Sequence, residues 1–239
     1  MRIEKILGKE ELKDIKVKIV PSTLHIDSKL QVQIDEEWQE FVKNLVEKGI
    51  KVWNGKKYRF EGIKENVFEI SETDYKTLMM LRNLDQLELR NNVTVSTIII
   101  TSDNYILFAK RKNVGVFSGV VAWIAGGLEP IDTSDDLLFD NMKVELNEEL
   151  GLENSEYDIF LEGMYSYKEI GQYSFHFIVN LKLTKEDMVE RFEHADEEDE
   201  NSELIFFENN KKGVDKILNH KNMLDQVKDY FSKYYEPKH

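Results

Sequence analysis

The sequence contains no cysteine and only three prolines among its 239 residues, and its 32 basic residues are outnumbered by 46 acidic ones. The lack of cysteine excludes disulfide bonds, cysteine-ligated zinc and thiol nucleophiles. The formal net charge of −14 argues against nonspecific binding to DNA, RNA or anionic membranes, which requires clustered lysine and arginine. A small phosphorylated ligand is still compatible with this charge, because a few local cations and a metal ion can offset the field.

Long hydrophobic runs are missing as well. Charged residues interrupt every apolar run near the N-terminus, so we find no signal-peptide core there. The longest uncharged stretch covers residues 113–128, and it is too short and too rich in glycine to span a bilayer. We therefore expect a soluble cytoplasmic protein.

The apolar content is sufficient for a packed core, since hydrophobic residues make up 41% of the chain and aromatic residues 11%. The length allows one large domain, or a domain of about 150 residues with a smaller partner. The polar turn at residues 89–92 is the best candidate for an internal boundary. We predict an N-terminal α+β extension over residues 1–92 and a second domain over residues 93–239.

The first 92 residues combine short alternating runs with helical patterns. We predict strands over residues 17–20 and 30–34, and helices over residues 35–48 and 73–82. Asp35 would cap the first helix and Gly49 would end it. Asn54 and Gly55 together predict a short hairpin turn.

After residue 92, long apolar or β-branched runs alternate with helical patterns. We predict strands over residues 94–101, 105–110, 120–125, 159–167, 173–183 and 204–207, and helices over residues 135–150 and 214–235. Gly151 would end the first of these helices. The acidic run at residues 193–203 is typical of a solvated loop. This order of elements predicts an α/β fold.

The most informative segment covers residues 126–152 and joins a double glycine to a helix rich in glutamate. At about 100° per residue, Glu145 and Glu149 stack on one side of the helix and Glu148 lies one ridge away. Carboxylates this close repel one another, and a shared hard divalent cation relieves the repulsion. The double glycine lets the backbone approach a ligand closely. The glutamate spacing taken alone is also common on a solvated helix face.

This segment resembles the Nudix box, a loop–helix motif written G-x5-E-x7-R-E-U-x-E-E-x-G-U. The second half of the motif matches residues 145–152, and its glycine entry matches Gly126 and Gly127. The strand predicted ahead of the box, at residues 105–111, also fits the family. The resemblance covers residues 93–235.

The resemblance implies a Nudix α/β/α sandwich with a mixed sheet, to which the N-terminal α+β extension would be added. It implies that Glu145, Glu148 and Glu149 are catalytic and hold Mg²⁺, for which Mn²⁺ could substitute. Gly126 and Gly127 would belong to the substrate-binding loop.

Two departures from the family pattern matter. The box arginine falls on Val144, and three extra residues lie between Gly127 and the helix. The first glutamate of the box has only Asp135 or Asp136 as a loose substitute. The family's arginine orients a metal-binding glutamate, so its absence bears directly on turnover.

These departures, together with the run Gly-Gly-Leu-Glu-Pro and the Asp-rich insert, resemble a sub-group similar to animal UDP-sugar hydrolases. Three tripeptides before residue 92 resemble the N-terminal region of that sub-group: Trp53-Asn54-Gly55, Tyr58-Arg59-Phe60 and Thr73-Asp74-Tyr75. The resemblance implies that Arg59 and Tyr75 contact the substrate. Structural roles are the alternative for both.

Further candidates lie outside the box. Arg111, between two lysines at a strand end, is interpreted as a phosphate clamp facing the metal, with an exposed basic turn as the alternative. Glu200 and Glu203 precede a strand, where Nudix enzymes often carry a general base; an acidic surface loop is the alternative. His176 lies in an apolar strand and is interpreted as a core or pocket-lining residue.

The expected function is Mg²⁺-dependent hydrolysis of a nucleoside diphosphate linked to another moiety, taken to be a nucleotide sugar, which yields a nucleoside monophosphate and a sugar phosphate. One alternative is a Nudix-like nucleotide-binding module without turnover, indicated by Val144. The other is a housekeeping Nudix pyrophosphatase acting on other nucleotides. We expect a small phosphorylated nucleotide as the partner, with no nucleic acid and no membrane, and a homodimer is compatible with the sequence.

Overall fold

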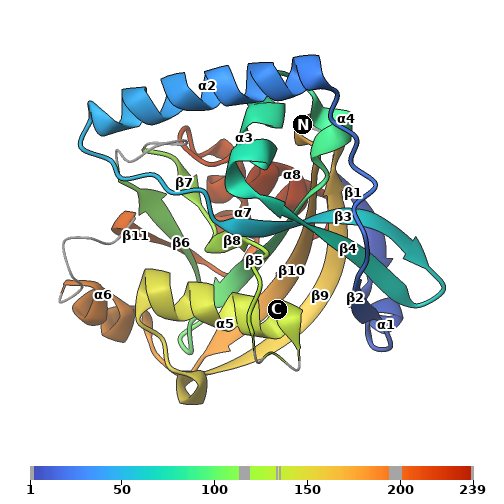
Figure 1. The fold of residues 1–239 in the computed structure, drawn as a ribbon. Coiled ribbons are helices and arrows are strands. Elements are labelled where there is room, and N and C mark those ends of the chain that lie inside the picture. The colour runs from blue at the N-terminus through green and yellow to red at the C-terminus, as the bar shows by residue number, and fades with distance from the viewer. Residues whose placement is uncertain (1–2, 113–118, 133, 135, 194–200, 238–239) are drawn as a thin grey trace.

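The computed structural model describes residues 3–112, 119–132, 134, 136–193 and 201–237 (Figure 1). Its strands are β1 Ile3–Gly8, β2 Lys16–Ile19, β3 Lys56–Lys64, β4 Val67–Asp74, β5 Asn92–Ile100, β6 Tyr105–Arg111, β7 Val121–Ala122, β8 Ala125–Gly127, β9 Tyr157–Tyr167, β10 Gln172–Leu181 and β11 Asn201–Glu208. Its helices are α1 Lys9–Leu12, α2 Ser28–Val46, α3 Tyr75–Asn83, α4 Leu87–Arg90, α5 Leu137–Leu150, α6 Lys185–Glu193, α7 Lys211–Asn219 and α8 Asp225–Lys233, with 3-10 turns at η1 Asn154–Glu156 and η2 Lys168–Ile170.

The strands pair into one sheet in the order β1-β9-β10-β5-β3-β4-β2, and the remaining strands join it at the side of β5. There β6 pairs with β5, β7 and β11, while β8 pairs with β5. The β10–β5 and β2–β4 pairs are parallel, whereas β9–β10 and β3–β4 are antiparallel. The sheet is therefore mixed, which confirms the predicted α/β class.

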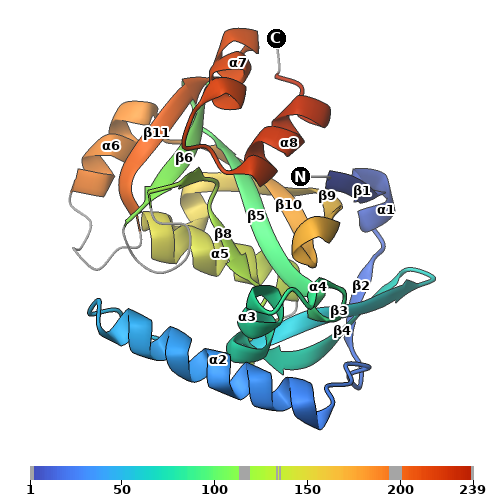
Figure 2. The ribbon, with the colours of Figure 1, turned by 90° about the horizontal axis from the view of Figure 1, so that it is seen from above.

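Strand β5 is buried on both faces, which explains its unbroken apolar sequence. On one face Val95 and Ile99 share a core cluster with Leu146 of α5. On the other face Ile98 belongs to a second cluster with Phe231 of α8. Helices thus cover both faces of the central strands, and Figure 2 shows α5 and α8 on opposite sides of β5.

The N-terminal strands extend the same sheet. Strand β1 pairs with β9, and β3 pairs with β5 through Arg59 and Asn92. Helices α2 and α3 pack on each other around Ile34, Met80 and Leu81, as a cluster of their own (Figure 1). The proposed domain boundary after residue 92 falls within β5, and the division into two domains stays a prediction.

The predicted strand at residues 30–34 is wrong, because these residues lie inside α2. The helix begins earlier than expected, and the Asp27 side chain caps it by accepting a hydrogen bond from the Leu30 N–H at 2.8 Å. Leu30 and Ile34 are four residues apart and share a helix face, so their spacing satisfied the strand pattern and the helix pattern equally. Burial of Ile34 against α3 favours the helix.

The predicted hairpin at Asn54 and Gly55 is also wrong. The hairpin in this region joins β3 and β4, and Glu65 takes a positive φ of 53° at its turn. The side chain of Asn54 instead accepts a hydrogen bond from the backbone N–H of Lys76 at 2.7 Å, near the start of α3. Asn54 therefore pairs with a backbone N–H near the start of α3 instead of forming a hairpin turn.

The predicted C-terminal helix over residues 214–235 is divided into α7 and α8. The segment between them bonds to β7: the Val121 N–H donates to the Asn222 carbonyl at 2.8 Å, and the Leu224 N–H donates to the Val121 carbonyl at 2.9 Å. A continuous helix would have used these backbone groups internally. The strand predicted at residues 120–125 is likewise divided, into β7 and β8, and α6 was not predicted.

The other predicted strands and the helix that ends at Gly151 are confirmed within a few residues. Within the described ranges, none of the helices is long and apolar enough to cross a membrane.

Candidate active site

Helix α5 carries the three glutamates of the box-like segment. It ends at Gly151, which takes the left-handed conformation at φ 62°, as the sequence predicted. Leu146 and Leu150 are buried in the core and fix the rotation of the helix. Glu145 and Glu149 lie one turn apart and so project from the same side of the helix.

Gly126, in β8, lies directly against the carboxylate of Glu145. A Cβ atom on Gly126 would come within 1.7 Å of Glu145 Oε1 and 2.1 Å of its Cδ. Only glycine lets this carboxylate rest on the strand. The close approach that the double glycine predicted is therefore, in the first instance, an approach to a glutamate side chain.

Gly127 has a different neighbour. A Cβ atom there would lie 3.3 Å from Nζ of Lys57, which forms an ion pair with Glu129. The loop that carries Glu129 is tied to α5 by Asn141, which accepts from the Glu129 N–H at 2.8 Å and donates to its carbonyl at 3.0 Å. These bonds hold the glycine strand and the glutamate helix in a fixed relation.

Glu149 is almost buried, with 8% of its surface exposed, and it contacts a residue that the sequence did not single out. Asn201, at the start of β11, donates a hydrogen bond from Nδ2 to Glu149 Oε2 at 2.7 Å. The other amide atom, Asn201 Oδ1, is buried and has no hydrogen-bond partner among the described residues. Its position within the acidic run at residues 193–203 was the only available signal, and that run pointed to its glutamates instead.

Arg111, Gly126 and Gly127 line one cavity of about 170 Å³ between β5, β8 and the start of α8. Arg111 also pairs in register with Asn201 across β6 and β11. The predicted phosphate clamp and the glycine strand are thus brought together, next to the residue that holds Glu149.

The walls of the cavity combine polar side chains with a larger apolar surface. Gln226 of α8 is 7% exposed, and its Oε1 has no hydrogen-bond partner among the described residues. Gln172 donates from Nε2 to Thr94 Oγ1 at 3.1 Å on another wall. Trp123 contributes an aromatic side chain. Such a lining suits a polar ligand with some aromatic or apolar surface.

None of the predicted catalytic glutamates that the structure describes lines this cavity itself, although Glu145 contacts its Gly126. Glu148 is exposed and lines a separate open depression with Lys143 and Val144. Glu203 projects from β11 with its side chain 53% exposed and forms an ion pair with Lys110 at 3.3 Å. Glu200 lies outside the described residues.

Arg59 and Tyr75 occupy other surroundings. The Arg59 side chain is 4% exposed and forms a 2.5 Å ion pair with Glu61, and it donates to the Leu89 carbonyl at 3.3 Å. The Tyr75 ring packs edge-on against Trp38, with ring centroids 6.1 Å apart, in the contact between α2 and α3. These contacts are structural in kind, and neither side chain lines the cavity of Arg111.

His176 is a core residue, which agrees with its interpretation from the sequence. It is 1% exposed and lies 3.0 Å from the Tyr167 hydroxyl, through its Nε2 atom. Burial, together with the positive charge of Lys5, lowers the pKa of His176 to about 3. The imidazole is therefore neutral at physiological pH, and it packs among Trp123, Tyr165 and Tyr230.

The atoms near Glu149 that could bind a cation are all oxygen atoms. Glu145 and Glu149 supply carboxylates and Asn201 supplies the unpartnered Oδ1. Hard divalent cations such as Mg²⁺ prefer such ligands and complete their shell with water or phosphate oxygens. In the part of the chain that the structure describes, no three Asp, Glu, His or Cys side chains form a metal-binding group. The types of oxygen donor present, carboxylate and amide, thus suit a hard divalent cation.

Comparison with known proteins found likeness only at the level of structure. The sequence matches no family model, and no curated protein matches it in sequence. Among solved structures, the DR0079 protein of Deinococcus radiodurans is 11% identical, with a TM-score of 0.47 over 61% of this chain and 84% of that one.

Two further structures have descriptions that name a family or an activity. A mutT/nudix family protein from Listeria innocua is 18% identical, with a TM-score of 0.41 over 59% of this chain and 92% of that one. An ADP-ribose pyrophosphatase from Streptococcus suis is 14% identical, with a TM-score of 0.34 over 59% and 85%.

Proposed function

We propose that this protein hydrolyses the diphosphate bond of a nucleoside diphosphate linked to another group, with a nucleotide sugar as its substrate class and Mg²⁺ or Mn²⁺ as its metal. The observation that carries the proposal is the double contact of Gly126. Its missing side chain makes room for the Glu145 carboxylate, and the same residue lines the cavity of Arg111. A carboxylate suited to a metal and a guanidinium suited to a phosphate therefore meet at one strand.

The proposed metal ligands are Glu145, Glu148 and Glu149. The contacts with Gly126 and Asn201 support the first and the last, while Glu148 is proposed on helical spacing alone. When bound there, a divalent cation supplies charge neutralisation of the diphosphate and a water of lowered pKa. Asn201 holds the Glu149 carboxylate in one orientation through its Nδ2–H group.

Substrate binding falls to the cavity residues. Arg111 would donate N–H groups to a nonbridging phosphate oxygen, a pairing for which the guanidinium fork is well shaped. Gly126 and Gly127 would let the phosphate chain approach the backbone of β8. The reaction forms a bond from water oxygen to phosphorus and breaks the phosphorus–oxygen bond of the anhydride. Its products are a nucleoside monophosphate and a sugar phosphate.

Glu200 and Glu203 are proposed as alternatives for the general base. Glu203 is occupied by Lys110 in an ion pair that is largely exposed, and such pairs exchange at little cost. Glu200 directly precedes Asn201 in the sequence. Arg59 and Tyr75 remain proposed ligand contacts on the sub-group resemblance alone.

Membership of the Nudix family is part of the same proposal. It rests on the match of residues 126–127 and 145–152 to the box, and on the finding that these two segments touch in the fold. The sub-group similar to UDP-sugar hydrolases is proposed on the Val144 position and the Asp-rich insert.

A substrate panel tests the proposal. UDP-glucose, GDP-mannose, ADP-ribose and diadenosine tetraphosphate would each be incubated with the protein and Mg²⁺, and the released phosphomonoester measured through alkaline phosphatase. We expect turnover of nucleotide sugars that is abolished by a chelator and by Glu149→Gln. The exposed Glu40→Gln on α2 is the matched charge control.

Turnover of only the dinucleotide would replace the nucleotide-sugar assignment with the housekeeping alternative. Calorimetric binding of UDP-glucose without product would establish the binding-module alternative, which the Val144 position raises. The absence of both binding and turnover with every compound of the panel would refute the proposal.

A further inference from the structure

Lys57, near the start of β3, lies against the strand that carries the double glycine. A Cβ atom on Gly127 would come within 3.3 Å of both Cδ and Nζ of Lys57, and within 3.4 Å of its Cε. The end of the lysine side chain therefore rests on the glycine, in space that a larger residue would crowd. Only 16% of the Lys57 side chain is exposed, so this cation is largely removed from water. The tripeptide resemblance pointed instead to Arg59, two residues further along the same strand.

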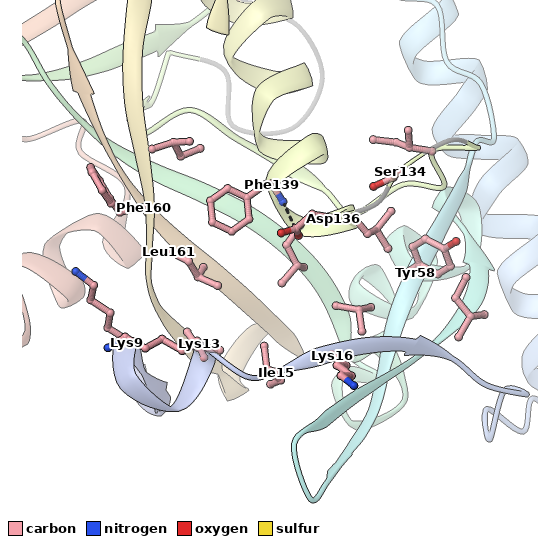
Figure 3. A pocket seen from close by; sticks show the side chains of 17 residues that line it. Lys9, Lys13, Ile15, Lys16, Tyr58, Ser134, Asp136, Phe139, Phe160 and Leu161 are labelled. Atoms are coloured by element: carbon pink, nitrogen blue, oxygen red, sulfur yellow. Dashed lines mark hydrogen bonds between the residues drawn. The ribbon is translucent and has the colours of Figure 1, made fainter. Parts of the chain in front are cut away.

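The ammonium of Lys57 lies on the face of the sheet that borders the cavity of Arg111. Gly127 pairs directly with Thr94 of β5, and directly opposed residues of antiparallel strands project to the same face. Thr94 lines the cavity, and so does Gly127 itself. Tyr58, the next residue of β3, lines a different cavity, beside the first turn of α5 (Figure 3). The alternation of side chains along β3 thus agrees with the position of Lys57.

The two glycines of β8 accommodate charged side chains of opposite sign. The Glu145 carboxylate lies against Gly126, and the Lys57 ammonium lies against Gly127. Because adjacent residues of a strand face opposite ways, the two charges lie on opposite faces of β8. The strand therefore carries a carboxylate suited to a metal on one face and an ammonium suited to a phosphate on the other, with only glycine backbone between them.

In the structure the Lys57 ammonium is paired with Glu129. The Glu129 side chain is 43% exposed, so its carboxylate stays in contact with water and can exchange the ammonium for hydration. The backbone need not move for this exchange, because Asn141 holds both the Glu129 N–H and its carbonyl. Among the described residues, Glu129 is the one hydrogen-bond partner of this ammonium, which has three N–H donors. The ammonium thus has donors to spare and a partner that can leave.

We propose that Lys57 binds a phosphate group of the substrate, and that Glu129 competes with that phosphate for the ammonium. This inference rests on the proposed function, since it assigns a further residue to the same diphosphate. Arg111 would bind one phosphate and Lys57 the other, beside Gly127. The flexible four-carbon stem of lysine lets the ammonium turn from the carboxylate to the ligand, where it forms a charge-assisted hydrogen bond. The chain before residue 92 then takes part in substrate binding through β3.

The test is a calorimetric titration of the full chain with methylenediphosphonate, whose P–C–P linkage cannot be hydrolysed, in the absence of metal. Lys57→Met keeps most of the stem and removes the charge, so we expect binding to weaken about tenfold or more. Glu129→Gln should instead tighten binding about two- to fivefold, because the neutral amide no longer holds the ammonium by its charge. Changes of opposite sign are the signature of competition.

A double variant separates competition from a general effect of charge. Lys57→Met/Glu129→Gln should bind no more tightly than Lys57→Met, because Glu129 acts through the lysine. Lys56→Met is the matched control on the same strand, since the Lys56 side chain is 73% exposed and its loss should leave the affinity within about twofold. Glu40→Gln on α2 controls for the loss of a carboxylate. Melting curves verify folding, and Lys57→Gln replaces Lys57→Met should the latter be unstable.

Several outcomes would overturn the proposal. They are the absence of binding by the parent, parental affinity in Lys57→Met, weaker binding in Glu129→Gln, and an equal gain from Glu129→Gln with and without Lys57. The probe has no cleavable bond, so these results do not depend on turnover. Nucleotide-sugar turnover by Lys57→Met at the parental KM would reject the role of Lys57 and leave the hydrolase activity standing. Binding that depends on Lys57, without turnover of any compound in the substrate panel, would do the reverse.

Discussion

Glu61 and Glu149 are both glutamates that the fold removes from water, yet their surroundings differ. The Glu61 side chain is 3% exposed and accepts hydrogen bonds from Arg59, Ser71 and Thr23, and none of the cavities described above is lined by it. Glu149 accepts a bond from Asn201, whose second amide atom is buried and has no partner among the described residues. Each site keeps one buried polar atom without a hydrogen-bond partner among the described residues, Arg59 Nε at the first and Asn201 Oδ1 at the second, but only the second lies beside a residue that lines the cavity of Arg111.

This difference teaches how to separate structural charges from functional ones. A buried charge that the protein itself compensates stabilises only if the whole set stays together. A buried polar atom without a hydrogen-bond partner costs free energy, and where it lies beside a cavity a bound ligand can remove that cost. We therefore expect changes at the Glu61 site to affect folding, and changes at the Glu149 site to affect turnover.

The largest expected effect is on stability. Arg59→Ala leaves Glu61 buried and without its cation, so we expect unfolding to become easier by about 3 to 5 kcal/mol in urea denaturation. Lys64→Ala is the control on the same hairpin, because the Lys64 side chain is 77% exposed in its ion pair with Glu69, and its loss should cost less than about 1 kcal/mol. A stable Arg59→Ala variant with a raised KM would instead place Arg59 at the ligand and break the comparison.

The next effect is on turnover. Glu145→Gln and Glu149→Gln keep the side-chain shape and remove the charge, so each should reduce kcat by about 10²-fold or more with an unchanged melting temperature. Glu40→Gln serves as the control. Glu148→Gln sharpens the assignment, since an equal loss would add this exposed glutamate to the metal shell, and a small loss would remove it. Near-normal rates in both Glu145→Gln and Glu149→Gln would make the site assignment wrong.

Gly126→Ala tests the contact between strand and carboxylate. The new methyl group would overlap the Glu145 carboxylate, which is the far end of a flexible side chain and can move away without unfolding the strand. Displacement by an ångström or more should lower kcat by up to about 10²-fold. Gly62→Ala is the matched control, because a Cβ atom there meets nothing within 4 Å. Equal activity in the two variants would show that the position of the Glu145 carboxylate is unimportant.

A smaller effect concerns pH. Burial alone would raise the pKa of Glu61, but hydrogen bonds from Ser71 and Thr23 and the charge of Arg59 bring the pKa below its ordinary value of 4.5. A lowered pKa in the folded state contributes stability above pH 4.5 that is lost as the pH falls through the lower, folded-state value. The stability difference between the parent and Glu61→Gln should therefore shrink below pH 4.5. A difference that stays constant with pH would contradict this account.

The smallest effect is expected at Val144, which occupies the position of the box arginine. Val144 is 42% exposed, so Val144→Arg places its guanidinium in water and should change stability by no more than about 0.5 kcal/mol. A gain in activity with a lower Mg²⁺ requirement would mean that the arginine can still orient a glutamate here. A melting temperature lowered by several degrees would contradict the exposed position of residue 144.

Local sequence patterns predicted much of the fold correctly where they fit only one kind of secondary structure. The β-branched run of β5 and the helix ended by Gly151 leave little choice, because one suits only a buried strand and the other has both periodicity and a stop signal. Ambiguous signals failed. Leu30 and Ile34 fit a strand or a helix, and contact with α3 decided for the helix.

The sequence by itself determined that Glu145 and Glu149 project from one side of a helix, because that relation depends only on the helical repeat. Only the tertiary structure decided what they meet there. Glu149 and Asn201 are 52 residues apart in the chain, and the Glu145 carboxylate reaches Gly126 through the packing of α5 against β8. Such contacts depend on sheet register and on the angle between helix and sheet. These are set by the sum of many weak packing interactions across the core, which no local pattern of residues encodes.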